Sequence, residues 1–356
     1  MKNSFIKRTT NKARLVHSVY KTRKREERFA KRYTSLHFDP QVRQSVIEYY
    51  KPYFTINPIY HEFYTEKTGV FDLRYIPNDL YYSRINSFYN NTTMAKVLDN
   101  KCFYTRIFGN HCHYPRTLAY RMNHFWYDEN MRILTESEVL NRVDKAKEIV
   151  VKQAVDSCGG HGVSFLNNDG DIIQLFQQTC NSILGDIVIQ YPFRQHEELR
   201  ALHPQSVNTV RIMSLLREGH VKICSTVLRI GIGGARVDNA SSGGIVCGVQ
   251  EDGRLRDRAY LTNGKMFLTH PTNGEIFSNH SIPSFEEIKK LICHLHPMLP
   301  HFRLVSWDFS VDEEGKPVLI ETNLNYGQLG FHQLCNGPLF GDDTKSVLDE
   351  VFERSN

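Results

Sequence analysis

The stretch from Val305 to Asn323, VSWDFSVDEEGKPVLIETN, decides how this chain is interpreted. Apolar residues alternate with polar ones before a polar segment containing glycine and proline, and a second apolar run follows, which predicts strand, tight turn and strand. Asp308 falls opposite the apolar face of the first strand, while Glu321 and Asn323 share one face at the end of the second. Three hard oxygen ligands could thereby converge on one point. A divalent cation such as Mg²⁺ prefers such a set, with phosphate oxygens completing its coordination shell. The alternative is a surface hairpin with ordinary polar residues.

The composition is that of a globular protein with room for two or three domains. The chain has 356 residues, of which 40% are hydrophobic and 23% charged. We find no apolar run long enough to span a bilayer and no signal-peptide pattern. The eight cysteines are scattered and form no Cys-x-x-Cys pair, which argues against a zinc ribbon and for reduced thiols. We therefore expect a cytoplasmic location.

Positive charge is concentrated at the N-terminus. Residues 1–35 contain twelve Lys or Arg and two Glu, a local charge of +10, whereas the whole chain carries +5. The segment has a helix-compatible pattern, so we expect a basic helical arm. It is either a solvated arm or a foot for an acidic partner or an anionic membrane surface, which would place the protein peripherally at the inner face of the membrane. Nucleic acid is an unlikely partner, because no aromatic-basic platform follows.

Lys152 ends an apolar strand and precedes a glycine-rich turn that contains Gly159, Gly160 and His161. Glycines let backbone N–H groups approach phosphate oxygens, while an ammonium group neutralises their charge. The turn is neither a Walker A sequence nor the dinucleotide fingerprint, since no Gly-Lys-Ser/Thr ends it. A plain glycine-rich hairpin fits this segment equally well.

The segment Gln190-Tyr191-Pro192-Phe193 interrupts a buried-type strand at its proline. An interrupted strand leaves backbone donors and acceptors unpaired, and the edge of an adenine ring could use them. Glu198 follows shortly afterwards and could bind ribose hydroxyls. The alternative is that these are ordinary loop residues.

Two arginines occupy the next pair of strands. Arg211 lies near the start of the first, on the face it shares with Thr209, and Arg229 lies near the end of the second. A polar, glycine-rich loop that contains Asn239 and Ser242 follows. Two arginines beside such a loop suit a reacting carboxylate or phosphoryl oxygen. Either arginine could instead form a structural ion pair.

The order of these motifs resembles the ATP-grasp superfamily. Three segments resemble more narrowly the sugar-transfer-associated ATP-grasp proteins linked to polysaccharide biosynthesis: Ser206-Val207-Asn208-Thr209-Val210-Arg211-Ile212, Ser242-Gly243-Gly244, and Trp307-Asp308 with Leu319-Ile320-Glu321-Thr322-Asn323. The resemblance covers about residues 95–340, and its specific part is the final hairpin. It implies an α+β fold in which two lobes grip ATP, at residues 106–190 (first lobe with the glycine-rich flap) and 191–356 (second lobe with the Mg²⁺ and substrate site). The first seventy residues or so fall outside the resemblance, and charge and composition predict two units before the lobes: 1–35 (basic helical arm) and 36–105 (N-terminal domain, mainly helical with some strand).

The resemblance also implies which residues bind ATP. Lys152 and Lys101 would contact its phosphates, and the flap residues Gly159, Gly160 and His161 would close over them. The adenine ring would be framed by Gln190, Tyr191 and Phe193, and the ribose would be bound by Glu198.

The remaining roles concern metal and phosphoryl group. Two Mg²⁺ ions would be held by Asp308, Glu321 and Asn323. The transferred phosphoryl group would be stabilised by Arg211, Arg229, Asn239 and Ser242. One departure concerns the acceptor side, where Leu324-Asn325-Tyr326-Gly327 replaces the more usual small or proline-containing run.

The family's chemistry predicts an ATP- and Mg²⁺-dependent carboxylate–amine ligase that acts through an acylphosphate, here on a small-molecule carboxylate and an amine or sugar acceptor in polysaccharide biosynthesis. Two alternatives remain open. One is a kinase that phosphorylates a sugar-type hydroxyl, and the other is a nucleotide-binding scaffold that docks a glycosyltransferase through its basic arm.

Overall fold

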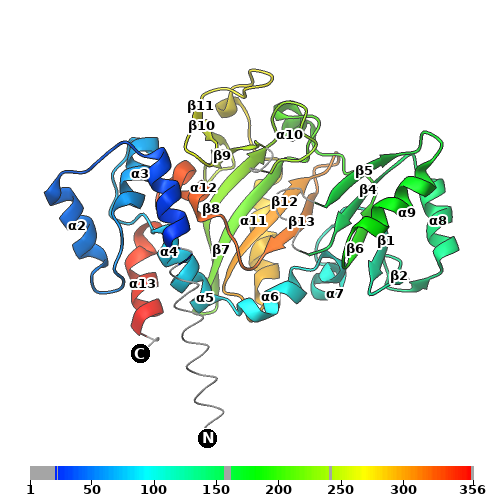
Figure 1. Cartoon of the computed structure of the whole chain (residues 1–356), viewed down its shortest axis with the longest axis horizontal. Coiled ribbons are helices and arrows are strands. Elements are labelled where there is room, and N and C mark those ends of the chain that lie inside the picture. The colour runs from blue at the N-terminus through cyan, green and yellow to red at the C-terminus, as the bar shows by residue number, and fades with distance from the viewer. Residues whose placement is uncertain (1–20, 22, 156–161, 240–242, 354–356) are drawn as a thin grey trace, which may run out of the picture.

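Two antiparallel sheets lie next to each other, and N- and C-terminal helices pack beside the larger one (Figure 1). The computed structural model describes residues 21, 23–155, 162–239 and 243–353. The smaller sheet has the order β3-β2-β1-β6-β4-β5. Its strands are β1 (Thr117–Met122), β2 (Phe125–Tyr127), β3 (Ile133–Leu134), β4 (Glu148–Gln153), β5 (Val163–Asn167) and β6 (Ile187–Gln190).

The larger sheet has the order β11-β10-β9-β8-β7-β12-β13. Its strands are β7 (Thr209–Arg217), β8 (His220–Ile230), β9 (Ile245–Val249), β10 (Leu255–Tyr260), β11 (Met266–Phe267), β12 (Leu304–Val311) and β13 (Pro317–Asn323). The α-helices are residues 23–33, α2 (Pro40–Tyr50), α3 (Ile59–Thr68), α4 (Asn78–Leu80), α5 (Asn86–Tyr89), α6 (Thr92–Leu98), α7 (Tyr104–Phe108), α8 (Glu136–Asp144), α9 (Ile172–Ser182), α10 (Glu197–Leu202), α11 (Phe285–Leu295), α12 (Leu329–Asn336) and α13 (Thr344–Glu353). This mixture of helices and two antiparallel sheets confirms the predicted α+β class.

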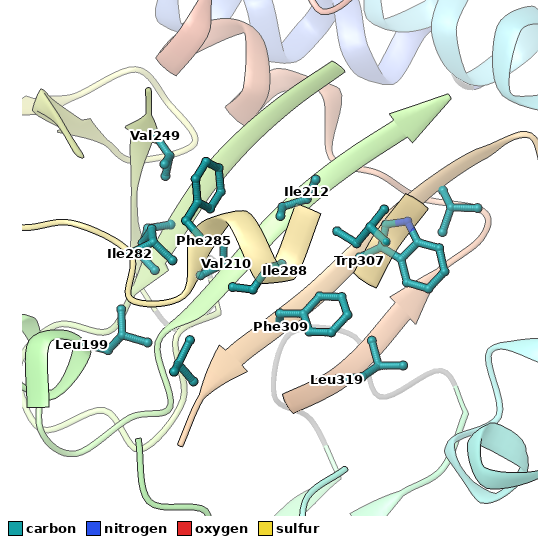
Figure 2. Packing of buried hydrophobic residues seen from close by; sticks show 14 of the residues in the cluster. Leu199, Val210, Ile212, Val249, Ile282, Phe285, Ile288, Trp307, Phe309 and Leu319 are labelled. Atoms are coloured by element: carbon teal, nitrogen blue, oxygen red, sulfur yellow. The ribbon is translucent and has the colours of Figure 1, made fainter. Parts of the chain in front are cut away.

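The predicted hairpin is present as β12 and β13. Its turn closes with a hydrogen bond from the Asp312 N–H to the Lys316 carbonyl (3.0 Å), and Gly315 adopts the positive φ (+81°) that favours glycine. Trp307 and Phe309 point to the apolar face of the larger sheet, where they share one hydrophobic cluster with Ile288 of α11, and Figure 2 shows Phe309 near Ile288. Burial of each such large side chain stabilises the fold by about 1.5–3 kcal/mol. The strand period of two therefore sends Asp308 to the opposite face.

One face of the smaller sheet is covered by α8 and α9 (Figure 1). Apolar residues of α8 (Val139, Val143) and α9 (Phe176) share a cluster with Ile149 and Ile189 of the strands. The start of α8 follows its sequence signature, since the side chains of Thr135 and Glu138 form the expected capping box. The backbone of β4 is thus held firmly where it carries Lys152.

The N-terminal helices share a hydrophobic cluster with the larger sheet and with α13. Val46 and Tyr50 of α2 belong to the same cluster as Leu348 and Val351 of α13. The side chain of Gln333 in α12 also bonds both backbone groups of Ile76, at 2.8 and 2.9 Å. The predicted division of the chain into four units stays a prediction. A domain boundary near residue 105 would divide this shared hydrophobic cluster.

Most of the predicted basic arm, residues 1–20 and residue 22, lies outside the described residues. Within the part of the chain that the structure does describe, no helix combines the length and the apolar character needed to cross a membrane.

Candidate functional site

A row of charged side chains crosses the larger sheet on the face opposite its apolar core. Glu321 of β13 pairs in register with Asp308 of β12, which in turn pairs with Arg211 of β7. Directly opposed residues on neighbouring strands project from the same face, so these three side chains are neighbours. Arg229 of β8 joins the row, because its strand pairs with β7 on the side away from β12.

Asp308 binds both arginines. Its Oδ1 accepts a hydrogen bond from Arg211 Nε (2.7 Å), and its Oδ2 accepts from Arg211 Nη2 (2.6 Å) and from Arg229 Nη1 (3.1 Å). The side chains are 3% exposed for Asp308 and 5% for each arginine. Burial alone would raise the pKa of Asp308, but Arg211 and then Arg229 outweigh it and hold that pKa below its usual range. The carboxylate is therefore ionised and firmly placed.

A second buried carboxylate, Asp238, completes the charge balance. It forms an ion pair with Arg229 at 3.2 Å and accepts a hydrogen bond from the Thr209 hydroxyl. Burial raises the pKa of Asp238, although Arg229 opposes this. Asn239 accepts a hydrogen bond from Arg229, and Gln328 accepts one from Arg211. Two guanidinium groups thus meet two carboxylates, as burial of charge requires.

This network borders a cavity of about 410 Å³ between the two sheets. Its lining includes many of the predicted site residues: Lys101, Lys152, Gln190, Tyr191, Phe193, Arg229, Asn239, Asp308 and Glu321. Apolar side chains from both lobes also contribute, namely Val150, Val163, Phe165 and Ile320. A cavity whose walls combine apolar and charged side chains is typical of a site for a ligand with both characters.

The lysines lie at the end of the cavity nearest Glu321. Lys101 Nζ approaches Glu321 Oε2 at 3.4 Å. Burial, followed by the positive charge of Lys101, lowers the pKa of Lys152 from its usual 10.5 to about 8. Two cations that line the same cavity favour an anionic ligand.

Several predicted residues lie elsewhere. Glu198 of α10 is not among the residues that line the cavity, and its carboxylate pairs with His280 (3.2 Å), so its contact with ribose stays a prediction that this position does not favour. The helix turns that side chain away from the lining, although its loop neighbours Arg194 and Gln195 belong to it. Arg211 lies behind Asp308 and, like Asn323, does not line the cavity. The predicted residues Gly159, Gly160, His161 and Ser242 lie outside the described residues.

Sequence reasoning missed four residues that border this site. Asp238 directly precedes Asn239 in the polar loop, and that adjacency was the available signal. Glu313 lies in the hairpin turn and lines the cavity. Arg236 also lines it, stacks over the ring of Phe165 at 3.8 Å and forms an ion pair with Glu148. These contacts join the loop after β8 to the smaller sheet.

Asp99, the fourth of these residues, fixes the chain that leaves β13. Its Oδ1 accepts hydrogen bonds from the Leu324 N–H (3.1 Å) and the Thr322 hydroxyl (3.4 Å). Burial and then the charge of Glu321 raise the pKa of Asp99 to about 7. This carboxyl group is a structural neighbour of the row, and no pattern in the sequence singled it out.

The donor set fits a hard divalent cation in its chemistry. Glu321 and Asp308 border the cavity, and Asn323 lies two residues beyond Glu321 on the same strand. The buried Nδ2 of Asn323 has no hydrogen-bond partner in the described structure. The described residues contain no group of three or more His, Cys, Asp or Glu side chains arranged to hold a metal. The oxygens available are therefore two carboxylates and one amide, and Asp308 shares its own with two arginines.

Comparisons with known proteins identify the family. The family model of sugar-transfer associated ATP-grasp proteins matches residues 81–348. No curated protein matches the chain. Similar solved structures include an L-amino acid ligase from Bacillus licheniformis, with 13% identity over 73% of this chain and 48% of that one and a TM-score of 0.40. A D-Ala:D-Ser ligase from Enterococcus faecalis has 10% identity over 73% of this chain and 61% of that one, with a TM-score of 0.42.

The chain spans roughly half to two thirds of these solved chains. The family match, in contrast, includes both sheets, the hairpin and the cavity between the sheets. It extends further than the range of about 95–340 that the motifs indicated, and it takes in the helices from residue 81 onward. The chain belongs to the sugar-transfer associated ATP-grasp family.

Proposed function

We propose that this protein is an ATP- and Mg²⁺-dependent carboxylate–amine ligase that modifies a sugar or glycan precursor in polysaccharide biosynthesis through an acylphosphate. The carrying observation is the cavity itself, which is apolar toward Phe165 and Ile320 and bordered by Lys101, Lys152 and the Arg229–Asp308 network. An adenine ring suits the apolar walls, and a triphosphate suits the cations.

The chain's own residues would do three things. Lys101 and Lys152 would neutralise the ATP phosphates, since both line the cavity and both are largely shielded from solvent. Gln190, Tyr191 and Phe193 would hold the base at the end of β6. Arg229 would stabilise the transferred phosphoryl group, because its guanidinium is buried at the cavity wall.

Glu321, Asn323 and Asp308 would hold Mg²⁺, and we propose two ions as the family chemistry implies. When bound, Mg²⁺ would neutralise negative charge on the phosphate oxygens of ATP. Attack of a substrate carboxylate on the γ-phosphorus would form the acylphosphate and release ADP, and an amine would then displace the phosphate.

An ADP-release screen of amino acids and sugar acids against amines and sugar nucleotides tests this function. Hydroxylamine separates a ligase from a kinase, because only an acylphosphate yields a hydroxamate. Glu321→Ala should abolish ADP release, since it removes a proposed Mg²⁺ ligand. The variant should still fold, because this carboxylate is 32% exposed. Glu198→Ala is the matched control, because that carboxylate lies outside the cavity and pairs with His280. Undiminished turnover in Glu321→Ala would contradict the proposal.

We also propose that the basic arm contacts an anionic membrane surface. In the described part of the helix, Ala30 and the neighbouring Phe29 pack against the body, in one cluster with Tyr60 and Phe63. Exposed cations recur at helical spacing on the other side: Lys21, Lys24, Arg25, Arg28, Lys31 and Arg32. Such a stripe favours anionic lipid by about 1 kcal/mol per cation near the surface.

Co-sedimentation with phosphatidylserine-containing liposomes checks this. Lys24→Glu/Lys31→Glu should abolish salt-sensitive binding, whereas Lys145→Glu/Lys147→Glu, which changes the same number of exposed charges, should not. Equal binding of both variants would refute the membrane contact. An acidic protein would then be the expected partner of these cations.

A further inference from the structure

Asp308 holds the two arginines of the site in place and leaves little of its own carboxylate for another ligand. A carboxylate offers about four lone-pair positions. Three are used by N–H groups of Arg211 and Arg229, at 2.6, 2.7 and 3.1 Å. A cation that joins Asp308 must therefore compete with, or weaken, the hydrogen bonds to the arginines.

Arg229 already presents an unused donor beside the cavity. Its side chain is buried, yet its Nε has no hydrogen-bond partner in the described structure. Its Nη1 and Nη2 are taken by Asp308, Asp238 and Asn239. Unpartnered buried donors are uncommon because they forfeit their hydration, so this group is placed to receive an acceptor oxygen.

Glu321 differs from its cross-strand neighbour. Its carboxylate is 32% exposed and approaches only Lys101, at 3.4 Å, among the described residues within ion-pair distance. It faces the same cavity and carries the same charge as Asp308, but it touches neither arginine. The two carboxylates therefore carry the same charge at one cavity, but only Asp308 restrains the guanidinium groups.

We propose that Asp308 is an exchangeable anchor: it restrains Arg211 and Arg229 while their hydrogen bonds occupy its carboxylate, and it releases them toward an anionic oxygen when it is shared with a divalent cation. This rests on the proposed function and deepens it. It couples cation binding to the affinity of the arginines for a phosphoryl or carboxylate oxygen. The anion affinity of the cavity is then low until the cation arrives, which keeps free carboxylates from occupying the site first.

The test measures ADP binding by calorimetry in the presence of a chelator, so that no cation bridges the phosphates. Asp308→Asn removes the anchoring charge and should tighten ADP binding by about tenfold, the value of roughly one charge-assisted hydrogen bond. Glu321→Gln removes the same charge from the same cavity without touching either arginine, and it should tighten binding by no more than about threefold. Equal tightening in both variants would overturn the proposal, because it would leave only a general charge effect.

A second measurement uses the wild-type chain, since the Asp308→Asn substitution could leave the buried arginines too poorly paired for folding. The side-chain Nε–H signals of ¹⁵N-labelled arginine are followed by NMR while Mg²⁺ alone is added, with Arg211→Lys and Arg229→Lys used for assignment. The Arg211 Nε–H signal, which reports the 2.7 Å bond to Asp308, should shift. Saturating Mg²⁺ without any shift would refute the exchange.

These outcomes are separable from the proposed function. A chain that releases no ADP with any acceptor would fail as a ligase, yet the chelator and NMR measurements would still report on Asp308. Conversely, a working ligase whose arginine signals ignore Mg²⁺ would retain its function and lose this coupling.

Discussion

The two sheets treat buried charge in opposite ways. At the larger sheet, Asp308 and Asp238, the latter in the loop after β8, pair with Arg211 and Arg229, so each of these four charges has an opposite partner. In the smaller sheet, Lys152 forms no ion pair with any described residue, and burial and Lys101 lower its pKa to about 8. One sheet holds a closed, neutral network, while the other holds an uncompensated cation.

This difference indicates how the two ends of the cavity bind a ligand. A buried cation without a carboxylate partner costs free energy, and an anion that binds beside it offsets that cost. A paired network is stable without a ligand and must exchange partners to bind one. The lysine end can therefore bind an anion directly, whereas the arginine end must first give up hydrogen bonds to its own carboxylates.

The largest expected effect is a difference in unfolding free energy between variants of the two sheets. Arg211→Met leaves Asp308 buried with only Arg229 and should cost about 3–5 kcal/mol of unfolding free energy. Lys152→Met removes a cation that has no carboxylate partner among the described residues, so it should change that free energy by less than about 1 kcal/mol or raise it. Urea denaturation checks both variants. Similar losses in the two would mean that Lys152 is as firmly compensated as Arg211.

A smaller effect is expected on pH dependence. Because burial and Lys101 lower the pKa of Lys152 to about 8, ADP affinity should fall by about tenfold as the pH rises from about 7 to about 9.5. Lys152→Arg, which stays charged, should lack that step in calorimetry. The folded pKa of about 8 lies below the usual 10.5, so the unfolded chain holds more protons between these values. Wild-type stability should therefore rise with pH across that window relative to Lys152→Met, and a fall would contradict the assignment.

Arg236 bridges the two regions and should matter less. Its side chain is 47% exposed, and its ion pair with Glu148 should contribute less than about 0.5 kcal/mol to stability. Because its guanidinium group also lines the cavity, its positive charge should contribute about 0.5–1 kcal/mol to the binding of an anionic nucleotide. Arg236→Gln should therefore weaken ADP binding about threefold with an unchanged melting temperature. A melting temperature that drops with unchanged affinity would assign Arg236 a purely structural role.

The smallest effect distinguishes two glutamates. Glu313 lines the cavity and Glu198 does not. Glu313→Ala should weaken ADP binding about two- to threefold through loss of one exposed hydrogen bond, and Glu198→Ala should leave it unchanged. Fluorescence titration with a labelled ADP measures both. A clear loss in Glu198→Ala would support the ribose role that its position does not favour.

Much of the site could be predicted because it lies on strands. Strand residues alternate between faces, so the pattern around Asp308 correctly separated it from Trp307 and Phe309 and placed it with Glu321. The direction of the Glu198 side chain was harder to predict for the complementary reason: the residue follows a proline-interrupted loop and lies in the first turn of a short helix, where a rotation of about 100° per residue decides the direction of a side chain. Its neighbours in sequence line the cavity while it pairs with His280.

The sequence by itself determined the hairpin, the order of the charged residues along the chain and the α+β class, because local periodicity and turn chemistry specify these. Only the tertiary structure decided which charges meet. Asp308, Arg211 and Arg229 lie on three different strands, and Asp238 lies on a loop, so their pairing depends on strand order and register. Those follow from packing of the whole core, including the contact of the N-terminal helices with α13, and from the need of every buried charge for a partner.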